Sequence, residues 1–237
     1  MRLKILTACC HTGAGLSSCA LNYMEHFPYI DSLWYGESFD YQSGMSVHAG
    51  PNSTDQSYWF VEISGLPFGL GNDMLGEGLQ WEPCFQSYKC TNPWRGMVYG
   101  MTARANGTDN KPIWAIWDAF SIQNATMLGW WEGHNCPVSI NSANDSVVAT
   151  VYTHVGRSGP SSANLTLGRT LIAIANFDNQ PQTVSLNVNL TALGHEARER
   201  QTLMTAPAIR HFQNASTHVV GEPLHVPASR GFLLLLP

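Results

Sequence analysis

The residues best suited to chemistry in this chain gather between Ile30 and Tyr41, in the stretch IDSLWYGESFDY. The stretch holds three carboxylates, Asp31, Glu37 and Asp40, among large aromatic side chains, although only 12% of the chain is charged. A flat aromatic ring can stack on the face of a pyranose while carboxylates accept hydrogen bonds from its hydroxyl groups. The stretch is therefore either one wall of a sugar-binding site or a buried strand followed by a polar turn.

The position of these residues relative to an expected strand favours a binding site. Residues Tyr29–Tyr35 are predicted to form a strand. In a (β/α) barrel, functional groups lie at the carboxyl ends of the strands and in the loops that follow them. Glu37 lies two residues beyond the predicted strand, next to Trp34 and Tyr35, and His11 follows an earlier predicted strand in the same way.

Two more candidates, Trp94 and Arg95, lie beside a later predicted strand. The full set of substrate-binding candidates is Glu37, Trp34, Tyr35, Asp31, His11, Trp94 and Arg95. Structural alternatives stay open for most of them, since Glu37 also suits a turn or an ion pair, and the aromatic rings also suit barrel packing. Asp31 needs a partner if it is buried, and Arg95 or Arg104 would serve. Glu62 and Asp73 are more simply interpreted as a polar outer surface, and no catalytic residue is assigned.

Composition excludes several classes of function. The net charge of −5 and the lack of a long basic run argue against nucleic acid or anionic membrane as a partner. No run of about 18 apolar residues is present, so no membrane span is expected. The chain has neither a CxxC pair nor an HExxH motif, so a zinc site is not expected, and no other metal or cofactor is predicted.

Asparagine spacing predicts a glycoprotein. Seven of the sixteen asparagines begin an N-x-S/T sequon: Asn52, Asn106, Asn124, Asn144, Asn164, Asn189 and Asn214. The serine and threonine content alone would give roughly two or three such motifs. We therefore expect a secreted, lysosomal or cell-surface protein, against the alternative of a surface that is merely rich in Ser and Thr.

The cysteines and the N-terminus also bear on whether the protein is exported. Cys84 and Cys90 flank a short loop and are predicted to form a local disulfide in an oxidising compartment, while Cys9 and Cys10 suit buried thiols. The apolar run Ile5–Cys10 is shorter than the core of an ordinary signal peptide. If the protein is exported, we expect its export signal to be missing from this chain.

The first part of the chain alternates between strand and helix patterns. Leu3–Ala8 and Arg95–Met101 are predicted as strands, and Ser18–Phe27 is predicted as a helix. Lys111–Phe120 is predicted as a second helix, with one apolar face that includes Trp117. Alternating strands and helices are typical of parallel α/β architecture.

From about Asp145 the pattern becomes all-β. The stretches VVATVYTHV, TLIAIANF, TVSLNVNL and GFLLLL are separated by turns rich in Gly, Pro, Asn and Ser. Val184 and Leu186 alternate with Ser185 and Asn187, as expected for an antiparallel strand that is buried on one face. Several strands at this spacing predict a β-sandwich.

Four phrases of the first part resemble a known family. PYIDSLWYGESFDY, YWFVEISGLPFGL, PWRGMVYGMTAR and IWAIWDAF together resemble the C-terminal part of glycoside hydrolase family 123-like proteins, over roughly Leu3–Trp131. Those proteins are (β/α)-barrel enzymes related to β-N-acetylgalactosaminidases, often followed by a β-sandwich. The resemblance implies an α/β plus all-β fold: a partial (β/α) TIM-type barrel at residues 1–131 and an antiparallel β-sandwich accessory domain at residues 132–237.

The resemblance also implies a chemistry. It predicts retaining hydrolysis of N-acetylhexosaminides assisted by the acetamido group of the substrate, with an adjacent Asp-Glu pair as the acid-base groups. This sequence contains no Asp-Glu dipeptide, and about three strands are predicted against the eight of a full barrel. We therefore expect a fragment of such an enzyme without its acid-base pair, binding a carbohydrate substrate. The alternative is a non-catalytic carbohydrate-binding or structural module.

Overall fold

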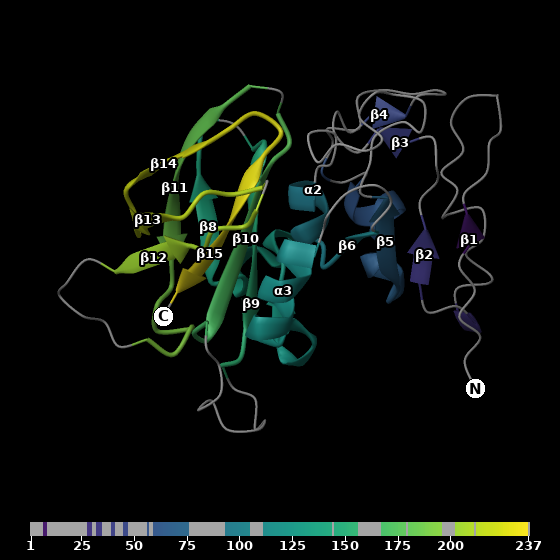
Figure 1. The fold of residues 1–237 in the computed structure, drawn as a ribbon, viewed down its shortest axis with the longest axis horizontal. Coiled ribbons are helices and arrows are strands. Elements are labelled where there is room, and N and C mark those ends of the chain that lie inside the picture. Colours follow the sequence, from purple (N-terminus) through teal and green to yellow (C-terminus); the bar gives the residue numbers. More distant parts are fainter. Residues whose placement is uncertain are drawn as a thin grey trace. The chain divides into compact units, whose positions relative to one another are not determined.

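A computed structural model shows two compact units, Met1–Asn110 and Lys111–Pro237 (Figure 1). The structure describes residues 7–8, 28–29, 32–34, 39–40, 45–46, 56, 59–75, 93–104, 111–143, 145–155, 167–178, 180–195, 202–210 and 212–236. The predicted helix at Ser18–Phe27 lies outside these residues, as does the predicted Cys84–Cys90 disulfide. Each unit is described below by itself.

The first unit is built on a parallel sheet. Its strands are β1 (Thr7–Ala8), β2 (Ser32–Trp34), β5 (Gly71–Leu75) and β6 (Thr102–Arg104), in the spatial order β1-β2-β5-β6. Each strand pairs in parallel with the next one along the chain, which is the arrangement of a (β/α) barrel. The prediction of a partial barrel is confirmed, and the described sheet is not closed. A short antiparallel pair, β3 (Phe39–Asp40) and β4 (Met45–Ser46), follows β2.

The segment before β5, whose sequence pattern is ambiguous, folds into two short helices. They are the π-helix η2 (Trp59–Ile63) and the 3-10 helix η3 (Leu66–Phe68). Gly65, which separates them, has a φ of 67°, a backbone conformation that side chains with a Cβ disfavour. Glycine and proline therefore set the breaks here, and the strand begins only at Gly71.

The prediction of a strand at Arg95–Met101 is wrong. The helix α2 (Pro93–Met97) begins this segment, and a turn leads from it into β6. Proline suits the first turn of a helix because its missing N–H would be unpaired there in any case. Gly100, with a φ of 73°, reverses the chain, and the Met101 N–H donates to Gly96 O at 3.0 Å. The apolar run reflects the burial of this helix and turn, which can mimic the pattern of a buried strand.

The second unit begins with the helix α3 (Lys111–Phe120), as predicted. Its buried residues, Ile113, Trp117 and Phe120, recur at helical spacing along one face. Trp117 contacts Tyr152 with ring centroids 6.4 Å apart, and Phe120 contacts the ring of His154 at 4.8 Å. The helix therefore belongs to the sandwich that follows it, and the 3-10 helices η6 (Ile122–Asn124) and η7 (Trp130–Asn135) flank the first strand of that sandwich.

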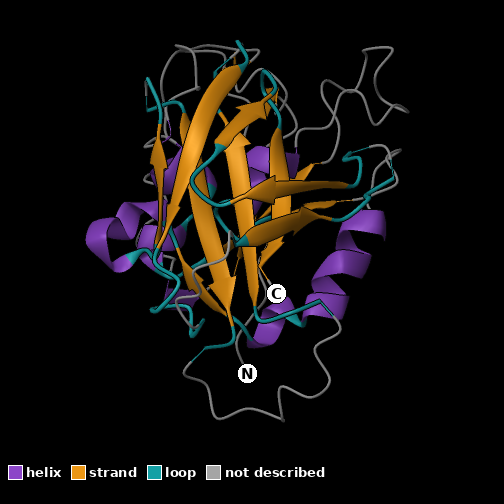
Figure 2. Ribbon diagram, turned by 90° about the vertical axis from the view of Figure 1, so that its left-hand side faces the viewer, coloured by secondary structure: helices purple, strands orange, loops and turns teal. Residues whose placement is uncertain are grey.

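Two antiparallel sheets make up the rest of this unit, and Figure 2 shows how far strands dominate it. The strands are β7 (Thr126–Leu128), β8 (Val138–Asn141), β9 (Val147–Thr153), β10 (Thr170–Asn176), β11 (Gln182–Val188), β12 (Leu203–Ala206), β13 (Ser216–Val219), β14 (Pro223–Val226) and β15 (Gly231–Leu236). The six-stranded sheet has the order β13-β12-β15-β10-β9-β7, and the three-stranded sheet has the order β14-β11-β8.

The apolar core of the second unit lies between these two sheets. Val184 and Leu186 of β11 are 2% and 1% exposed, whereas Asn187, which follows Leu186, is exposed to solvent. They join Ile172 and Ile174 of β10, together with residues of β8, β9, β14 and β15, in one cluster. Two sheets that share one core form a sandwich, so the predicted architecture of the second half is confirmed.

The division between the units falls earlier than the sequence suggested. We placed it between residues 131 and 132, whereas the structure divides at Asn110 and Lys111. The reason is the strand β7, which pairs with β9 through Thr126↔Thr153 and thereby belongs to the sandwich sheet. A three-residue strand of this kind carries too little periodicity to be assigned to either unit from sequence.

Candidate functional site

The candidate site lies at one edge of the parallel sheet. The carboxyl ends of parallel strands meet at the same edge, and in barrels this edge carries the functional groups. In the first unit β1, β2, β5 and β6 end at Ala8, Trp34, Leu75 and Arg104. The chain segments that follow these four residues therefore start from a common edge, although they lie far apart in the sequence.

The register of the sheet brings an aromatic residue and a carboxylate residue together near this edge. Trp34, the last residue of β2, pairs with Ala8 of β1 and with Asp73 of β5, and Asp73 pairs with Thr102 of β6. Residues in register on neighbouring parallel strands lie on the same face of the sheet. The backbone thus places Trp34 and Asp73 side by side in one row.

The register makes Asp73 a further candidate, although its sequence setting favoured a polar outer surface. A signal for it does exist in the sequence. Asn72 and Asp73 are consecutive polar residues within GNDML, the sequence of β5. Parallel strands are covered on both faces and normally read as apolar runs, so two adjacent polar residues are unusual there. The signal becomes clear only once this segment is known to be an inner strand of a parallel sheet.

Most of the other predicted binding residues lie outside the described part of the chain. This holds for Glu37, Tyr35, Asp31 and His11, which stay predictions. In the sequence, Glu37 follows the end of β2 by three residues and His11 follows the end of β1 by three residues.

Trp94 and Arg95 are described and have a different setting from the one expected. Both lie on α2, which precedes β6 in the chain and packs against it, and each is 1% exposed. The nearby Tyr99 is also buried, stacks on Trp59 at 6.3 Å and donates a hydrogen bond from its hydroxyl to Gln56 O at 2.9 Å. Trp94 and Arg95 are themselves buried in the first unit, so contact of either with a ligand stays a proposal.

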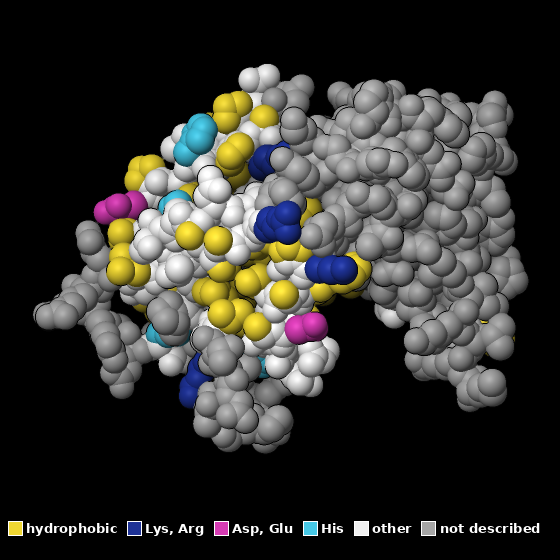
Figure 3. Space-filling view, viewed as in Figure 1, with side chains coloured by type: hydrophobic (Ala, Val, Ile, Leu, Met, Phe, Trp, Pro, Cys, Tyr) yellow, Lys and Arg dark blue, Asp and Glu magenta, His cyan; other side chains and the backbone are white. Residues whose placement is uncertain are grey.

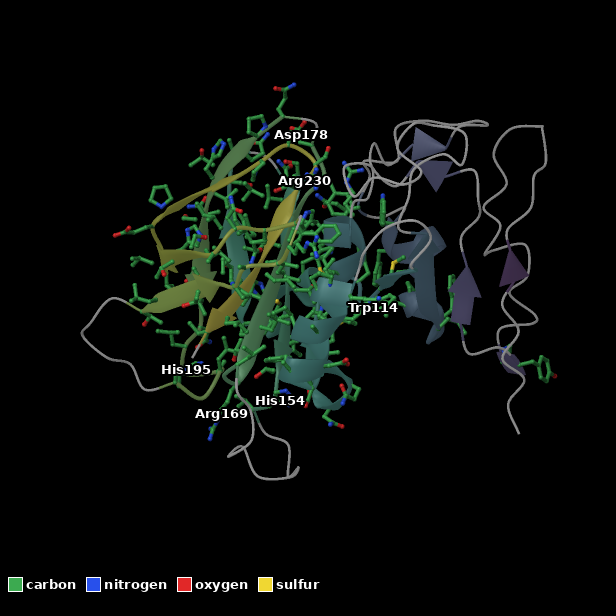
Figure 4. The ribbon with its side chains drawn as sticks, viewed as in Figure 1. Trp114, His154, Arg169, Asp178, His195 and Arg230 are labelled. Atoms are coloured by element: carbon green, nitrogen blue, oxygen red, sulfur yellow. The ribbon has the colours of Figure 1, made fainter. Side chains whose placement is uncertain are left out.

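Two polar arrangements in the sandwich, among others, are formed by its own residues. Asn176 is fully buried, and its Nδ2 donates to Gln180 O at 2.9 Å and to Pro227 O at 3.2 Å. Its Oδ1 accepts from the Asp178 N–H at 2.9 Å, within the β10–β11 turn. The bond to Pro227 O joins this turn to the segment after β14. Figure 4 places Asp178 and Arg230 at one end of the sandwich, with His154, Arg169 and His195 at the other end.

The second arrangement is a Ser–His pair on β13. Ser216 Oγ and His218 Nε2 are 2.8 Å apart, and the imidazole meets the ring of Phe232 edge-on. Burial lowers the pKa of His218, so the neutral imidazole is the favoured form. The same holds for His195, whose pKa is lowered by burial and then by the nearby charge of Arg169.

Metal, thiol and membrane features can be stated for the described part of the chain. No group of three His, Cys, Asp or Glu side chains there is close enough to hold a metal ion. Cys136 carries a free, buried thiol, and burial raises its pKa. None of the described helices is both long enough and apolar enough to span a bilayer.

The described sequon asparagines are all exposed. They are Asn124, Asn189 and Asn214, whereas Asn52, Asn106, Asn144 and Asn164 lie outside the described residues. Exposure is what attachment of a glycan requires of the folded protein. Glycosylation itself stays a prediction at all seven positions.

Comparisons with known proteins address both units. The model of the glycoside hydrolase 123 TIM-barrel domain matches residues 7–106, and the model of the glycoside hydrolase 123 C-terminal domain matches residues 109–237. The two matches meet close to the division at Asn110, so the same boundary emerges from sequence families and from structure. A search of the curated proteins found no match.

Proposed function

Since the chain belongs to the glycoside hydrolase 123 family, we propose that it binds N-acetylhexosaminides and takes part in their retaining hydrolysis. The family supports a glycoside hydrolase-like protein with a carbohydrate substrate. The observation that carries the proposal is the pairing of Trp34 with Asp73 beside the carboxyl edge of the parallel sheet. Aromatic rings and carboxylates are the groups that hold a pyranose by stacking and by hydrogen bonds.

The proposed mechanism is assisted by the substrate. The acetamido oxygen attacks the anomeric carbon, the glycosidic C1–O bond breaks, and a carboxylic acid protonates the departing oxygen. Water then attacks the same carbon and opens the cyclic intermediate, so that two inversions give net retention. Families of this type are exceptions to the scheme with a protein nucleophile.

The residues of this chain are proposed to bind and orient the sugar. Trp34 and Tyr35 would stack on the pyranose ring, and Glu37 and Asp73 would accept hydrogen bonds from hydroxyl groups. No acid-base pair is assigned in this chain, because its 237 residues contain no Asp-Glu dipeptide. The lack of an Asp-Glu dipeptide also favours a second candidate function, a carbohydrate-binding module that does not catalyse.

Calorimetric titration with N-acetylgalactosamine and N-acetylglucosamine tests the binding. Trp34→Ala is expected to weaken the affinity about tenfold, or about 1.4 kcal/mol, because one stacked aromatic ring is lost. Tyr29→Ala is the matched control, since Tyr29 is 69% exposed and precedes β2 rather than following it. Equal losses in the two variants, or no binding by the unaltered chain, would contradict the proposed site.

Turnover distinguishes the two candidate functions. The chain is incubated with aryl N-acetylgalactosaminide and aryl N-acetylglucosaminide, and release of the phenol is followed by absorbance. Binding without release, under conditions where a catalytically complete family member releases phenol, assigns the binding module. Release that is lost in Trp34→Ala assigns the enzyme, in which case one of the carboxylates of this chain acts as the acid.

A further inference from the structure

The outer strands of the sandwich have backbone groups that can pair with another chain. Within the described residues, the six-stranded sheet ends in β7 and β13, and the three-stranded sheet ends in β8 and β14. An outer strand has a row of backbone N–H and C=O groups without a neighbouring strand and can pair with a second copy of the chain. Natural proteins block such pairing with charged side chains, with proline or by covering the strand.

Only one of these four strands carries such protection in its own sequence. β14, with the sequence PLHV, contains a proline, Pro223, at its first position. The sequences of the other three are TML in β7, VSIN in β8 and STHV in β13, without Lys, Arg, Asp, Glu or Pro. Charged side chains are also sparse on the face of the described sandwich that Figure 3 shows. Within the described part of the sandwich, the sequences of these three strands carry no such protection.

A sequon lies beside each of the three unprotected strands. Asn124 stands two residues before β7, and Asn214 stands two residues before β13. In both cases the residue that supplies the sequon hydroxyl is the first residue of the strand: Thr126 in β7 and Ser216 in β13. The third sequon, at Asn189, is joined to the start of β8.

A backbone hydrogen bond places the Asn189 sequon beside β8. The Asn189 N–H donates to Pro137 O at 2.7 Å, and Pro137 directly precedes β8. The protected strand β14 has no sequon in its sequence or next to it. The described sequons thus accompany the outer strands whose own sequences lack charge and proline, and they are absent from the one whose sequence contains proline.

The geometry of the acceptor amides suits attachment of a glycan. All three asparagines are exposed. Asn189 uses its Oδ1 to accept a hydrogen bond from the Ala192 N–H at 3.1 Å, and this oxygen is not the atom that would carry a sugar. In contrast, the buried Asn176 commits its Nδ2 to backbone carbonyls and is followed two residues later by Asp178, so it is not a sequon.

We propose that N-linked glycans at Asn124, Asn189 and Asn214 cover the outer strands β7, β8 and β13 and prevent edge-to-edge association of the sandwich. In the modification, the amide Nδ2 bonds to the anomeric carbon of an oligosaccharide carried on a lipid pyrophosphate. The bond between that carbon and the pyrophosphate oxygen breaks, the lipid pyrophosphate leaves, and Nδ2 loses one proton. The proposal is independent of the carbohydrate site in the first unit.

Occupancy is tested on the full chain secreted from cultured eukaryotic cells behind an added export signal. Treatment with peptide N-glycosidase in heavy-oxygen water converts each occupied asparagine to labelled aspartate, which peptide mass spectrometry identifies. We expect the label at all three positions and none at Asn187, an exposed asparagine on β11 that does not begin a sequon. Secreted, folded protein without label at these positions would overturn the proposal.

The covering role is tested on protein that has already folded. An endoglycosidase that leaves one sugar on each site shortens the glycans, and size-exclusion chromatography at increasing concentration follows the result. We expect the monomer peak of the trimmed protein to be lost in favour of larger species, while the untrimmed protein stays monomeric. A trimmed protein that stays monomeric at every concentration overturns the covering role.

A rescue variant shows whether the outer strands are responsible. Ser139→Lys on β8 and Thr217→Lys on β13 introduce charges at exposed positions of two of the strands. Because a charge on an outer strand opposes pairing, the trimmed doubly substituted protein is expected to keep more of its monomer peak than the trimmed unaltered protein, with β7 as the remaining route of association. Association that is unchanged in this variant shows that another surface is responsible and overturns the covering role. Asn187→Gln serves as a control that changes an asparagine without touching a sequon.

Discussion

At the scale of single residues, Gln213 shows how a side chain can take the place of a missing strand. β12 pairs with β15 through Thr205↔Leu235 and then departs from it. Beside this gap, Gln213 Oε1 accepts from the Leu233 N–H at 2.8 Å, and its Nε2 donates to Leu233 O at 3.0 Å and to Pro207 O at 2.8 Å. One amide therefore satisfies both backbone groups of a buried strand residue.

We predict that Gln213→Ala lowers the free energy of unfolding by about 1–3 kcal/mol, because the buried N–H and C=O of Leu233 lose their partner. Urea unfolding followed by near-UV circular dichroism measures the change. Gln123→Ala, at an exposed position in η6, is the control and is expected to stay within about 0.5 kcal/mol of the unaltered protein. An equal effect of the two substitutions would show that the amide is not needed.

His218 gives the stability of the sandwich a pH dependence whose sign follows from its environment. Burial lowers the pKa of this imidazole, so the folded chain favours the neutral form. Between the folded pKa and the unfolded value of about 6.5, the unfolded chain binds more protons, and stability rises with pH. The contribution of His218 is complete above about pH 6.5 and is lost as the pH falls through the folded pKa.

We therefore expect the free energy of unfolding to fall as the pH is lowered below about 6.5, and His218→Gln to reduce this slope. Part of the slope should remain in the variant, because the pKa of His195 is lowered too. Urea titrations at a series of pH values give the comparison. The exposed His134 is the control, and a slope that changes as much in His134→Gln as in His218→Gln would refute the assignment.

At the scale of elements, α3 illustrates a segment whose sequence and setting agree. Its apolar residues recur at helical spacing, and the same residues are buried in the structure. The ring of Phe120 meets His154, and His154 Nε2 lies 2.8 Å from the backbone oxygen of Phe120. The end of the helix is thereby tied to the end of β9, which is a tertiary contact that no local pattern encodes.

We predict that Phe120→Ala destabilises the second unit by about 3–5 kcal/mol, because a fully buried aromatic side chain is replaced by a cavity. Phe120 is 0% exposed. Asp118→Ala lies two residues away on the exposed face of the same helix and is expected to change stability by less than about 0.5 kcal/mol. Urea unfolding of both variants checks the difference, and similar midpoints would contradict the packing described for α3.

The segment at Arg95–Met101 shows where element prediction from sequence fails. Its run of apolar residues has the composition of a buried strand, yet it folds as the end of α2 and a turn. Short apolar runs cannot be assigned by periodicity, because a buried helix turn and a buried strand are apolar on all sides. Pro93, which opens α2, was the local signal that favoured a helix.

At the scale of the whole molecule, the two units differ in how completely each is built. The sandwich has a continuous core between its sheets, drawn from residues of the second unit alone. The described parallel sheet of the first unit has four strands, half of the eight in a closed barrel. The second unit thus has the features of an independent domain.

We expect residues 111–237, expressed alone, to fold cooperatively. Their unfolding in urea should be a single transition seen alike by near-UV and far-UV circular dichroism. Amide protons of β9 and β10, whose residues are all buried, should exchange more slowly than those of β13. A broad transition that differs between the two probes would show that the sandwich depends on the first unit.

The sequence by itself determined the features that repeat over short distances. The alternation in β11, the apolar face of α3, the seven sequons and the family phrases can all be recognised without a structure. Each depends on residues that are close in the chain, since helix and strand periods act over a few positions.

Only the tertiary structure decided which distant segments become neighbours. It placed Trp34 beside Asp73, assigned β7 to the sandwich and set the three described sequons next to the outer strands that lack charge. Sheet order and register join residues that lie tens of positions apart, and a shift by one residue turns every side chain to the other face. The energy that selects one pairing comes from packing of the whole sheet, which no local stretch of sequence contains.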